Sequence, residues 1–340
     1  MPANREDRIL SLLASATEIV CALGLRERLV GRSHECDFPP SVLQLPQATR
    51  PRFDVGASSA SIDRQVKRLA SEAREIQALG VYEVLPGLLR RLRPTHIVTQ
   101  VQCDVCAVSY KDVQAAVRRE SAGNPEIVSL QPDSLDAIWQ DFRRVGQALG
   151  VPREGDRLVE RICGRIEAIR RVARGAARRP SVAAIEWADP LMAAGNWTPE
   201  LIEMAGGQSL FGTPGHHSPW LDFGDLARAD PDIIIVMPCG YGLARTLADV
   251  SLLERRHGWE RLRAVTNGAV YAADGNQYFN RPGPRLAESA EILAEILHPG
   301  HFDFGHEGTG WQRVSRSAKG PLTGPSPLST AAGQPSPSKI

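Results

Sequence analysis

Short apolar segments with the length of buried strands alternate with amphipathic helical segments through most of the chain. The clearest ones are RILSLLA (8–14), HIVTQVQ (96–102), SVAAIEW (181–187), DIIIVMPCG (232–240) and AVYAADG (269–275). Runs of this kind are typical of strands that are buried on both faces of a parallel sheet. Because such strands alternate with helices, the sequence predicts parallel sheets covered by helices, and therefore an α/β fold.

A repeated pattern indicates two similar lobes. The segment LLRRLRPTHIVTQ (88–100) resembles DLARADPDIIIVMP (225–238), since in each a helix ends near a proline and a buried strand follows. Between the two copies, residues 155–175 are amphipathic, highly charged and closed by Gly175, as expected of a rigid connecting helix.

These features set the predicted domain limits. Beyond Pro299 the composition becomes rich in Pro, Ser and Gly and offers little to bury, which is typical of a disordered segment. We predict an N-terminal lobe over residues 8–150, a connecting helix over 151–177, a C-terminal lobe over 178–300 and a disordered tail over 301–340.

Charge and cysteine content exclude several classes of protein. The 40 Lys and Arg residues are balanced by 39 Asp and Glu residues, so there is no basic excess with which to bind nucleic acid. The six cysteines are scattered over a chain too long to need disulfides for stability, which argues against a secreted disulfide scaffold and favours a reducing compartment.

The N-terminal segment MPANREDRILSLLASATEIVCALGL has an apolar stretch after two arginines, as an export signal has. Glu18 interrupts its apolar run, and Glu6 and Asp7 dilute the positive charge before it, so we expect no signal peptide. Ser15 and Thr17 are instead expected to cap a helix that follows the first strand. No segment approaches the roughly 18 apolar residues that span a bilayer. The sequence therefore predicts a cytoplasmic protein without a membrane span.

Unusual polar and aromatic stretches follow the predicted strands. Ligands of open parallel sheets bind at the carboxyl ends of the strands. The loops at those ends are SHECDFPP (33–40), QCDVC (102–106), EWADP (186–190), PCGYG (238–242) and DGNQYFNRPGPR (274–285). We expect these loops to form the binding site.

Four segments carry a resemblance to a known family: SLLASATEIVCALG (11–24), VGRSHECDFPP (30–40), TQVQCDVCAVS (99–109) and DGNQYFNRPGPRL (274–286). In them the chain resembles the class III periplasmic solute-binding proteins, in particular the cobalamin-binding branch, over roughly residues 8–298. The resemblance implies two Rossmann-like lobes with parallel sheets, joined by one long helix, with the ligand in the cleft between them. It also implies a corrinoid (cobalamin) as bound ligand, no catalysis, a monomer, and either a cytoplasmic binder or the solute-binding component of an ABC importer.

The candidate ligand-binding residues come from the loops named above. Aromatic side chains in the second lobe suit a flat macrocycle, and His and Cys side chains suit cobalt or another soft metal. The set is His34, Glu35, Cys36, Gln102, Cys103, Cys106, Glu186, Trp187, Trp197, Trp220, Cys239, Tyr241, Asn276, Tyr278, Phe279 and Arg281, with His34, Cys103 and Cys106 as candidate metal ligands.

The pair Cys103 and Cys106 has several interpretations. A structural zinc site needs four ligands, and the sequence has no second CxxC. A thioredoxin-like pair is disfavoured because the predicted helix cap at Ser109 leaves Cys103 several residues upstream of the helix. A pocket wall is our first interpretation and a metal ligand the second.

Two other functions stay open on the same residues. One is a ferric-siderophore or haem binder with the same fold. The other is a metal-dependent or iron–sulfur enzyme that uses the cysteines of the cleft. Importer-linked relatives present an acidic residue at the tip of each lobe, and here Glu203 falls near the second position while Leu88 falls near the first.

Overall fold

The computed structural model describes residues 7–76, 82–85, 87–100, 113–114, 117 and 124–315. The first lobe is built on a four-stranded parallel sheet in the order β2-β1-β5-β6. Its strands are β1 (Ile9–Ser11), β2 (Leu29–Gly31), β5 (His96–Gln100) and β6 (Glu126–Leu130). The helices α1 (Ala14–Ala22) and α5 (Leu135–Ala148) contribute to its hydrophobic core.

The second lobe contains a six-stranded sheet in the order β12-β11-β10-β7-β8, with β9 also paired to β7. The strands are β7 (Ser181–Ala188), β8 (Leu191–Ala193), β9 (Gln208–Ser209), β10 (Ile233–Val236), β11 (Val270–Ala273) and β12 (Trp311–Arg313). The predicted parallel pairing is present among β7, β10 and β11. The edge strands β8 and β12 are antiparallel, which the prediction missed. For β8 the reason is local, because two residues separate it from β7, and so tight a turn permits only antiparallel pairing.

Helices cover the second sheet. They are α7 (Thr198–Met204), α8 (Phe223–Ala229), α9 (Leu243–Glu254), α10 (Arg263–Thr266) and α11 (Leu286–Leu297). Short helical turns occur at Arg26–Arg28, Pro40–Gln44 and Trp259–Arg261, and a π-helical turn, η4, at Gly275–Phe279. The second copy of the repeated pattern thus supplies α8 and β10, as the first supplies α3 (Leu88–Leu92) and β5.

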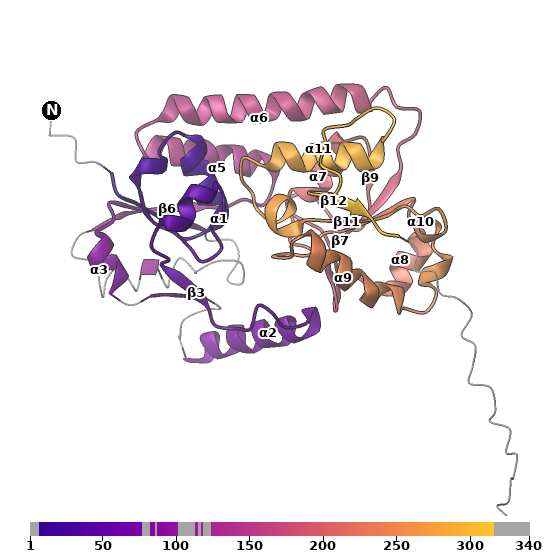
Figure 1. The fold of residues 1–340 in the computed structure, drawn as a ribbon, viewed down its shortest axis with the longest axis horizontal. Coiled ribbons are helices and arrows are strands. Elements are labelled where there is room, and N and C mark those ends of the chain that lie inside the picture. Colours follow the sequence, from indigo (N-terminus) through magenta and orange to yellow (C-terminus); the bar gives the residue numbers. More distant parts are fainter. Residues whose placement is uncertain are drawn as a thin grey trace, which may run out of the picture.

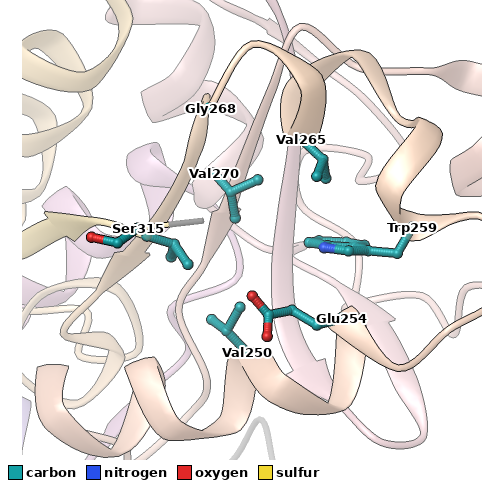
Figure 2. A pocket seen from close by; sticks show the side chains of 8 residues that line it. Val250, Glu254, Trp259, Val265, Gly268, Val270 and Ser315 are labelled. Atoms are coloured by element: carbon teal, nitrogen blue, oxygen red, sulfur yellow. The ribbon is translucent and has the colours of Figure 1, made fainter. Parts of the chain in front are cut away.

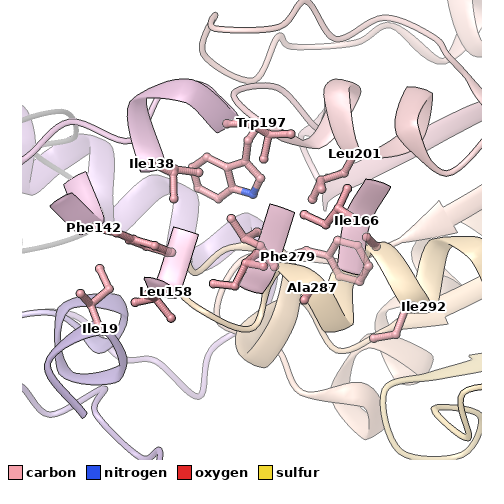
Figure 3. Packing of buried hydrophobic residues seen from close by; sticks show 14 of the residues in the cluster. Ile19, Ile138, Phe142, Leu158, Ile166, Trp197, Leu201, Phe279, Ala287 and Ile292 are labelled. Atoms are coloured by element: carbon pink, nitrogen blue, oxygen red, sulfur yellow. The ribbon is translucent and has the colours of Figure 1, made fainter. Parts of the chain in front are cut away.

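One long helix, α6 (Pro152–Ala173), runs along both lobes (Figure 1). It contacts α5 of the first lobe and α7 and α11 of the second. Its buried residues Leu158, Ile162 and Ile166 belong to one continuous core that also includes Phe142 and Phe279 (Figure 3). Because the apolar face of α6 is shared in this way, the lobes are joined through a packed core as well as through the chain.

The α2 segment extends from the first lobe toward the second. Helix α2 (Ser59–Ile76) lies between β3 (Thr49–Pro51) and β4 (Tyr82–Val84), which form a separate antiparallel pair. Figure 1 shows α2 at the lower edge of the molecule, on the opposite side from α6. The sequence analysis did not identify this helix.

Two predictions about the ends of elements are wrong. Ser15 and Thr17 do not cap α1, because the helix begins at Ala14 and both residues lie inside its first turns, buried. The disordered tail does not begin at residue 301, because the described chain continues to residue 315 and β12 pairs with β11. The prediction from composition failed because polar contacts hold residues 301–315 in place. Trp311 Nε1 donates to Glu295 Oε2 at 2.6 Å, and Phe304 N donates to Glu295 Oε1 at 2.5 Å. No helix in the described ranges is both long and apolar enough to cross a bilayer.

Candidate functional site

The loops at the carboxyl ends of both sheets meet between the lobes. Residues 33–37 follow β2 of the first lobe, and the segment 274–285 follows β11 of the second. Arg281 Nη2 of the second segment donates to the carbonyl oxygen of Glu35 in the first at 3.2 Å. This is the edge at which ligands of parallel sheets bind.

Four charged side chains, Glu18, Asp37, Arg281 and Arg285, join the lobes there, and we call them the inter-lobe cluster. Arg281 donates to Asp37 Oδ1 at 2.5 Å, to Asp37 Oδ2 at 3.0 Å and to Glu18 Oε1 at 3.3 Å. Arg285 donates to Glu18 Oε1 at 2.6 Å and to Oε2 at 3.0 Å. Only 2% of the Glu18 side chain is exposed, and only 6% of that of Arg281.

Asp37 and Arg281 of the inter-lobe cluster stabilise each other in their charged forms. Burial alone would raise the pKa of Asp37, but the hydrogen bonds and charge of Arg281 outweigh burial and lower it. Burial alone would lower the pKa of Arg281, yet its bonds to Asp37 and Glu18 raise it. Buried charges of opposite sign within hydrogen-bond distance stabilise each other's charged forms. The two carboxylates and the two guanidinium groups therefore balance one another.

A second contact between the lobes is aromatic, and we call it the aromatic contact. Ile62 of α2 packs against Trp187 and Tyr241 of the second lobe, whose ring centroids are 5.3 Å apart. Arg245 of α9 lies over the Tyr241 ring at 3.7 Å and donates to the carbonyl oxygens of Val55 and Ala57, which precede α2. Helix α2 therefore covers the carboxyl ends of β7 and β10.

Lys67 of α2 adds a further contact at the rim. Its Nζ lies 4.6 Å from the centroid of the Trp220 ring. Trp220 is 57% exposed, so its ring borders solvent while the aromatic contact is buried.

His34 lies beside these contacts, in the loop after β2. Its Nδ1 is 2.8 Å from Thr49 Oγ1, and Thr49 Oγ1 donates its proton to Ser33 Oγ at 3.0 Å. The bond to Thr49 fixes the orientation of the ring, and Nε2 lies 3.9 Å from Glu35 Oε1. Burial, with a smaller effect of Arg32, lowers the pKa of His34 to about 4. The imidazole is thus neutral at pH 7, as a metal-ligating histidine must be.

The lowered pKa of His34 predicts pH-dependent stability. The unfolded chain binds a proton at His34 near pH 6.5, whereas the folded chain does so only near pH 4. Stability from this residue is therefore lost as the pH falls through that interval, by on the order of 2–3 kcal/mol. Urea unfolding of wild type and His34→Gln at pH 7 and pH 4 measures it, and the wild-type advantage should shrink by that amount.

Comparison with the variant removes the effect of other groups. Burial raises the pKa of Asp141 to about 6, so Asp141 favours the folded state as the pH falls. That contribution has the opposite sign but is present in both proteins. An unchanged difference between wild type and variant would contradict the assignment of His34.

Three predicted ligand residues lie in the hydrophobic core instead. Trp197 is 7% exposed and packs against Ile138 and Leu201 (Figure 3). Phe279 is 1% exposed in the same core. Cys36 is also 1% exposed, and its Sγ accepts from Thr17 Oγ1 at 2.9 Å. These side chains help to form the core that supports the loops, and their contact with the ligand stays a prediction.

Other candidates lie on the loops as predicted. Ser218 Oγ donates to Glu186 Oε2 at 2.8 Å, and Asn276 Oδ1 accepts from Arg281 at 3.0 Å. Tyr278 lies with its ring centroid 5.6 Å from the Arg285 guanidinium, and Cys239 is half-buried beside the aromatic contact.

Gln102, Cys103 and Cys106 lie outside the described residues. Their predicted roles as pocket wall or metal ligands therefore stay predictions. Among the residues that are described, no group of three or more His, Cys, Asp or Glu side chains could hold a metal ion.

Sequence reasoning missed most of the inter-lobe cluster. Glu18 carried a signal, since it is the one charged residue within the apolar helix ASATEIVCA, but its charge was interpreted only as evidence against an export signal. Asp37 and Arg285 lay within recognised motifs without a partner to suggest pairing. Pairs separated by more than 240 positions, such as Arg281 with Asp37, leave no trace in local patterns.

A small cavity of about 30 Å³ lies elsewhere, between α9, α10 and the amino end of β11 (Figure 2). Val250, Trp259 and Val270 line it. Ligand pockets usually enclose roughly 300–1,000 Å³, so this cavity is far too small for a macrocycle. It also lies at the amino edge of the second sheet, whereas ligands of parallel sheets bind at the carboxyl edge.

Comparison with known proteins identifies relatives along most of the chain. The family model described as periplasmic binding protein matches residues 89–276. An uncharacterised ABC transporter substrate-binding lipoprotein of Bacillus subtilis is 22% identical over 299 residues, which cover 87% of this chain and 81% of the relative. A vitamin B12-binding protein of Vibrio cholerae is 22% identical over 310 residues, covering 86% and 89% of the two chains.

A solved structure agrees with the fold. The periplasmic haem-binding protein of Roseiflexus sp. RS-1 is 25% identical with a TM-score of 0.62, and the match covers 86% of this chain and 98% of that one. The prediction of a cytoplasmic location is wrong, because these relatives are periplasmic or lipoprotein components.

Proposed function

This chain belongs to the periplasmic binding protein family, and we propose that it binds a corrinoid between its two lobes as the solute-binding component of an ABC importer. The family is one of solute-binding proteins, and the proposal assigns no catalytic step to the chain. The expected partners are one corrinoid molecule and a permease, and the expected state is a monomer.

The observation that carries the proposal is the chemistry of the loops between the lobes. The exposed Trp220 offers an aromatic surface that suits a flat ring system, and Trp187 and Tyr241 offer two more once α2 moves away from them. The guanidinium groups of Arg281 and Arg285 are already paired with Glu18 and Asp37. A ligand with several carboxylates would have to break these buried pairs, which is costly. A corrinoid, whose ring carries neutral amide side chains, fits without that cost.

His34 is proposed as a ligand of the corrinoid cobalt. The low pKa keeps the ring neutral, as metal ligation by histidine requires. The bond from Nδ1 to Thr49 fixes the orientation of the ring, as is usual for metal-ligating histidines.

Haem is the second candidate. It is supported by the similarity to the periplasmic haem-binding protein of Roseiflexus. A neutral His34 would also suit haem iron, but the two haem carboxylates would require cations other than Arg281 and Arg285.

A titration distinguishes the two ligands. Purified protein is titrated with cyanocobalamin, with dicyanocobinamide and with haemin, and absorption spectra are recorded. We expect a dissociation constant for cyanocobalamin in the micromolar range or below. Tight binding of haemin with no binding of either corrinoid would overturn the proposal.

The His34→Ala variant tests the role in cobalt ligation. With aquocobinamide, whose axial water can be replaced, wild type should change the cobalt absorption bands and His34→Ala should not. We expect His34→Ala to bind the ring about tenfold more weakly, because one metal bond is lost while the aromatic surfaces stay. Identical spectra for the two proteins would exclude His34 as the ligand.

The permease is expected to contact the exposed tips of the lobes. Glu203 at the end of α7 is exposed and pairs with Arg179. Leu88, at the corresponding position of the first lobe, is buried in α3.

A further inference from the structure

Four buried polar atoms at the aromatic contact point to a ligand subsite. They are Trp187 Nε1, Tyr241 Oη, Ser59 Oγ and Asp249 Oδ2, and none has a hydrogen-bond partner among the residues that the structure describes. Ser59 is fully buried, Tyr241 is 2% exposed and Trp187 is 9% exposed. Buried polar side-chain atoms are nearly always paired, so four in one place require an explanation.

The four residues come from both lobes. Ser59 begins α2, whereas Trp187 lies near the end of β7 and Asp249 lies on α9. Tyr241 contacts Trp187 ring to ring, and the Asp249 charge acts on Tyr241. Ser59 is close enough to Asp249 to affect its pKa, although the two side chains do not meet the geometry of a hydrogen bond. The atoms thus lie around the contact between α2 and the second lobe.

The guanidinium of Arg245, which faces Tyr241, is already paired. Arg245 donates from Nη1 and Nη2 to the carbonyl oxygens of Val55 and Ala57, both at 2.6 Å. Its guanidinium lies over the Tyr241 ring, with Cζ 3.7 Å from the ring centroid, and is close enough to the Tyr241 hydroxyl to affect its pKa. A carboxylate ligand brought to this place would therefore meet the negative charge of Asp249 without a free cation to offset it.

The donor and acceptor pattern matches a primary amide. Trp187 Nε1 can only donate, the Tyr241 and Ser59 hydroxyls can do either, and the Asp249 carboxylate accepts. A carboxamide presents one acceptor oxygen and two N–H donors, so its oxygen pairs with Trp187 and its N–H groups pair with Asp249.

We infer that Trp187, Tyr241, Ser59 and Asp249 form a subsite for a primary amide of the ligand, clamped between α2 and the second lobe. The inference rests on the proposed function, since corrinoids carry such amides around the ring. Because the four atoms are buried, the amide can reach them only when α2 moves away from Trp187 and Tyr241. The subsite therefore couples amide recognition to the position of α2.

The test uses Tyr241→Phe, which removes the hydroxyl and keeps the ring, and Trp187→Phe, which removes the indole N–H and also makes the ring system smaller. Trp187→Phe and Tyr241→Phe should each weaken cyanocobalamin binding about 3- to 10-fold, as expected for one lost hydrogen bond. Tyr241→Phe without ligand should melt higher than wild type, by about 2–4 °C, because a buried unpaired polar group is removed. If the Tyr241 hydroxyl only supported the fold, Tyr241→Phe would lower both the affinity and the melting temperature. Trp187→Phe should melt lower than wild type, because the smaller ring leaves a cavity.

Trp197→Phe is the matched control. Trp197 Nε1 is also buried and without a hydrogen-bond partner in the described part of the chain, but it lies in the main core. Its substitution should change the melting temperature while leaving cyanocobalamin affinity within twofold of wild type.

A second measurement tests the amide itself. Wild type is titrated with cyanocobalamin derivatives in which a single peripheral amide is hydrolysed to a carboxylic acid. At least one of them should bind tenfold more weakly than the parent, because a carboxylate next to Asp249 is repelled. Asp249→Asn should reduce that difference to about threefold or less, since the repelling charge is gone.

The outcomes distinguish a failure of the proposed function from a failure of the subsite alone. If wild type binds no cyanocobalamin, the proposed function fails and this inference fails with it. If wild type binds but Trp187→Phe, Tyr241→Phe and Asp249→Asn all retain wild-type affinity and discrimination, the subsite alone is wrong.

Discussion

A chain that ends at residue 300 is expected to lose its folded second lobe. The truncation removes β12, an edge strand of the second sheet, and with it the Trp311 ring that belongs to the core. It also removes every partner of the Glu295 carboxylate, which is 5% exposed. A buried carboxylate without partners costs several kcal/mol, and the lost core packing adds about 3 kcal/mol. Thermal unfolding followed by circular dichroism should show a broad transition or none near the wild-type temperature.

A chain that ends at residue 315 is the control. It keeps β12 and the contacts of Glu295, so its melting temperature should stay within about 2 °C of wild type. A single substitution, Trp311→Phe, removes the hydrogen bond from Nε1 to Glu295 together with part of the buried ring, and should lower stability by at least about 2 kcal/mol. A truncated protein that melts like wild type would show that residues 301–315 contribute nothing, against the contacts described.

The general fold was predictable because its signals are local. The apolar runs at 181–187 and 232–240 could hardly be anything but buried strands, and the connecting helix α6 was readable from its apolar spacing and its final glycine. The tail limit was wrong because the residues that hold segment 301–315 are polar ones on α11, far from it in the sequence. Composition indicates how much apolar surface a segment can bury. It does not indicate which buried acceptor on another element will bind the segment's N–H groups.

The site was predictable only as a set of loops. The motifs correctly placed Trp187, Tyr241 and Arg281 at the carboxyl ends of strands. They could not distinguish Trp187, which meets α2, from Trp197, which fills the core, because both follow the same kind of apolar run. That difference is decided by α2, a helix whose apolar face, with Ile62 and Leu69, points to partners that no local pattern names.

The substitution Glu18→Gln is expected to be among the most destabilising single changes in the chain. Glu18 is the shared acceptor of Arg281 and Arg285, which lie on the other lobe. With the charge removed, Arg281 keeps Asp37, but Arg285 keeps only the Gln277 oxygen and the faces of aromatic rings. Removing one partner of a buried ion pair typically costs about 3–5 kcal/mol, because the remaining charge is desolvated and uncompensated. Urea unfolding at pH 7 should show this loss.

The loss of stability in Glu18→Gln depends on the burial of the ion pair rather than on its charge alone. Two further variants distinguish these causes. Glu167 forms an ion pair with Arg170 on the solvent side of α6, where both side chains are at least 40% exposed, so Glu167→Gln should cost less than about 1 kcal/mol.

In the double variant Glu18→Gln/Arg285→Gln, the uncompensated guanidinium is gone and the two amides can pair. We therefore expect the double variant to recover at least about 1 kcal/mol relative to Glu18→Gln alone. If Glu18→Gln costs no more than Glu167→Gln, the inter-lobe cluster is not a buried ionic link between the lobes. A double variant that is less stable than Glu18→Gln alone would instead mean that Arg285 stabilises the fold through Phe38 and Tyr278, whose rings its guanidinium faces.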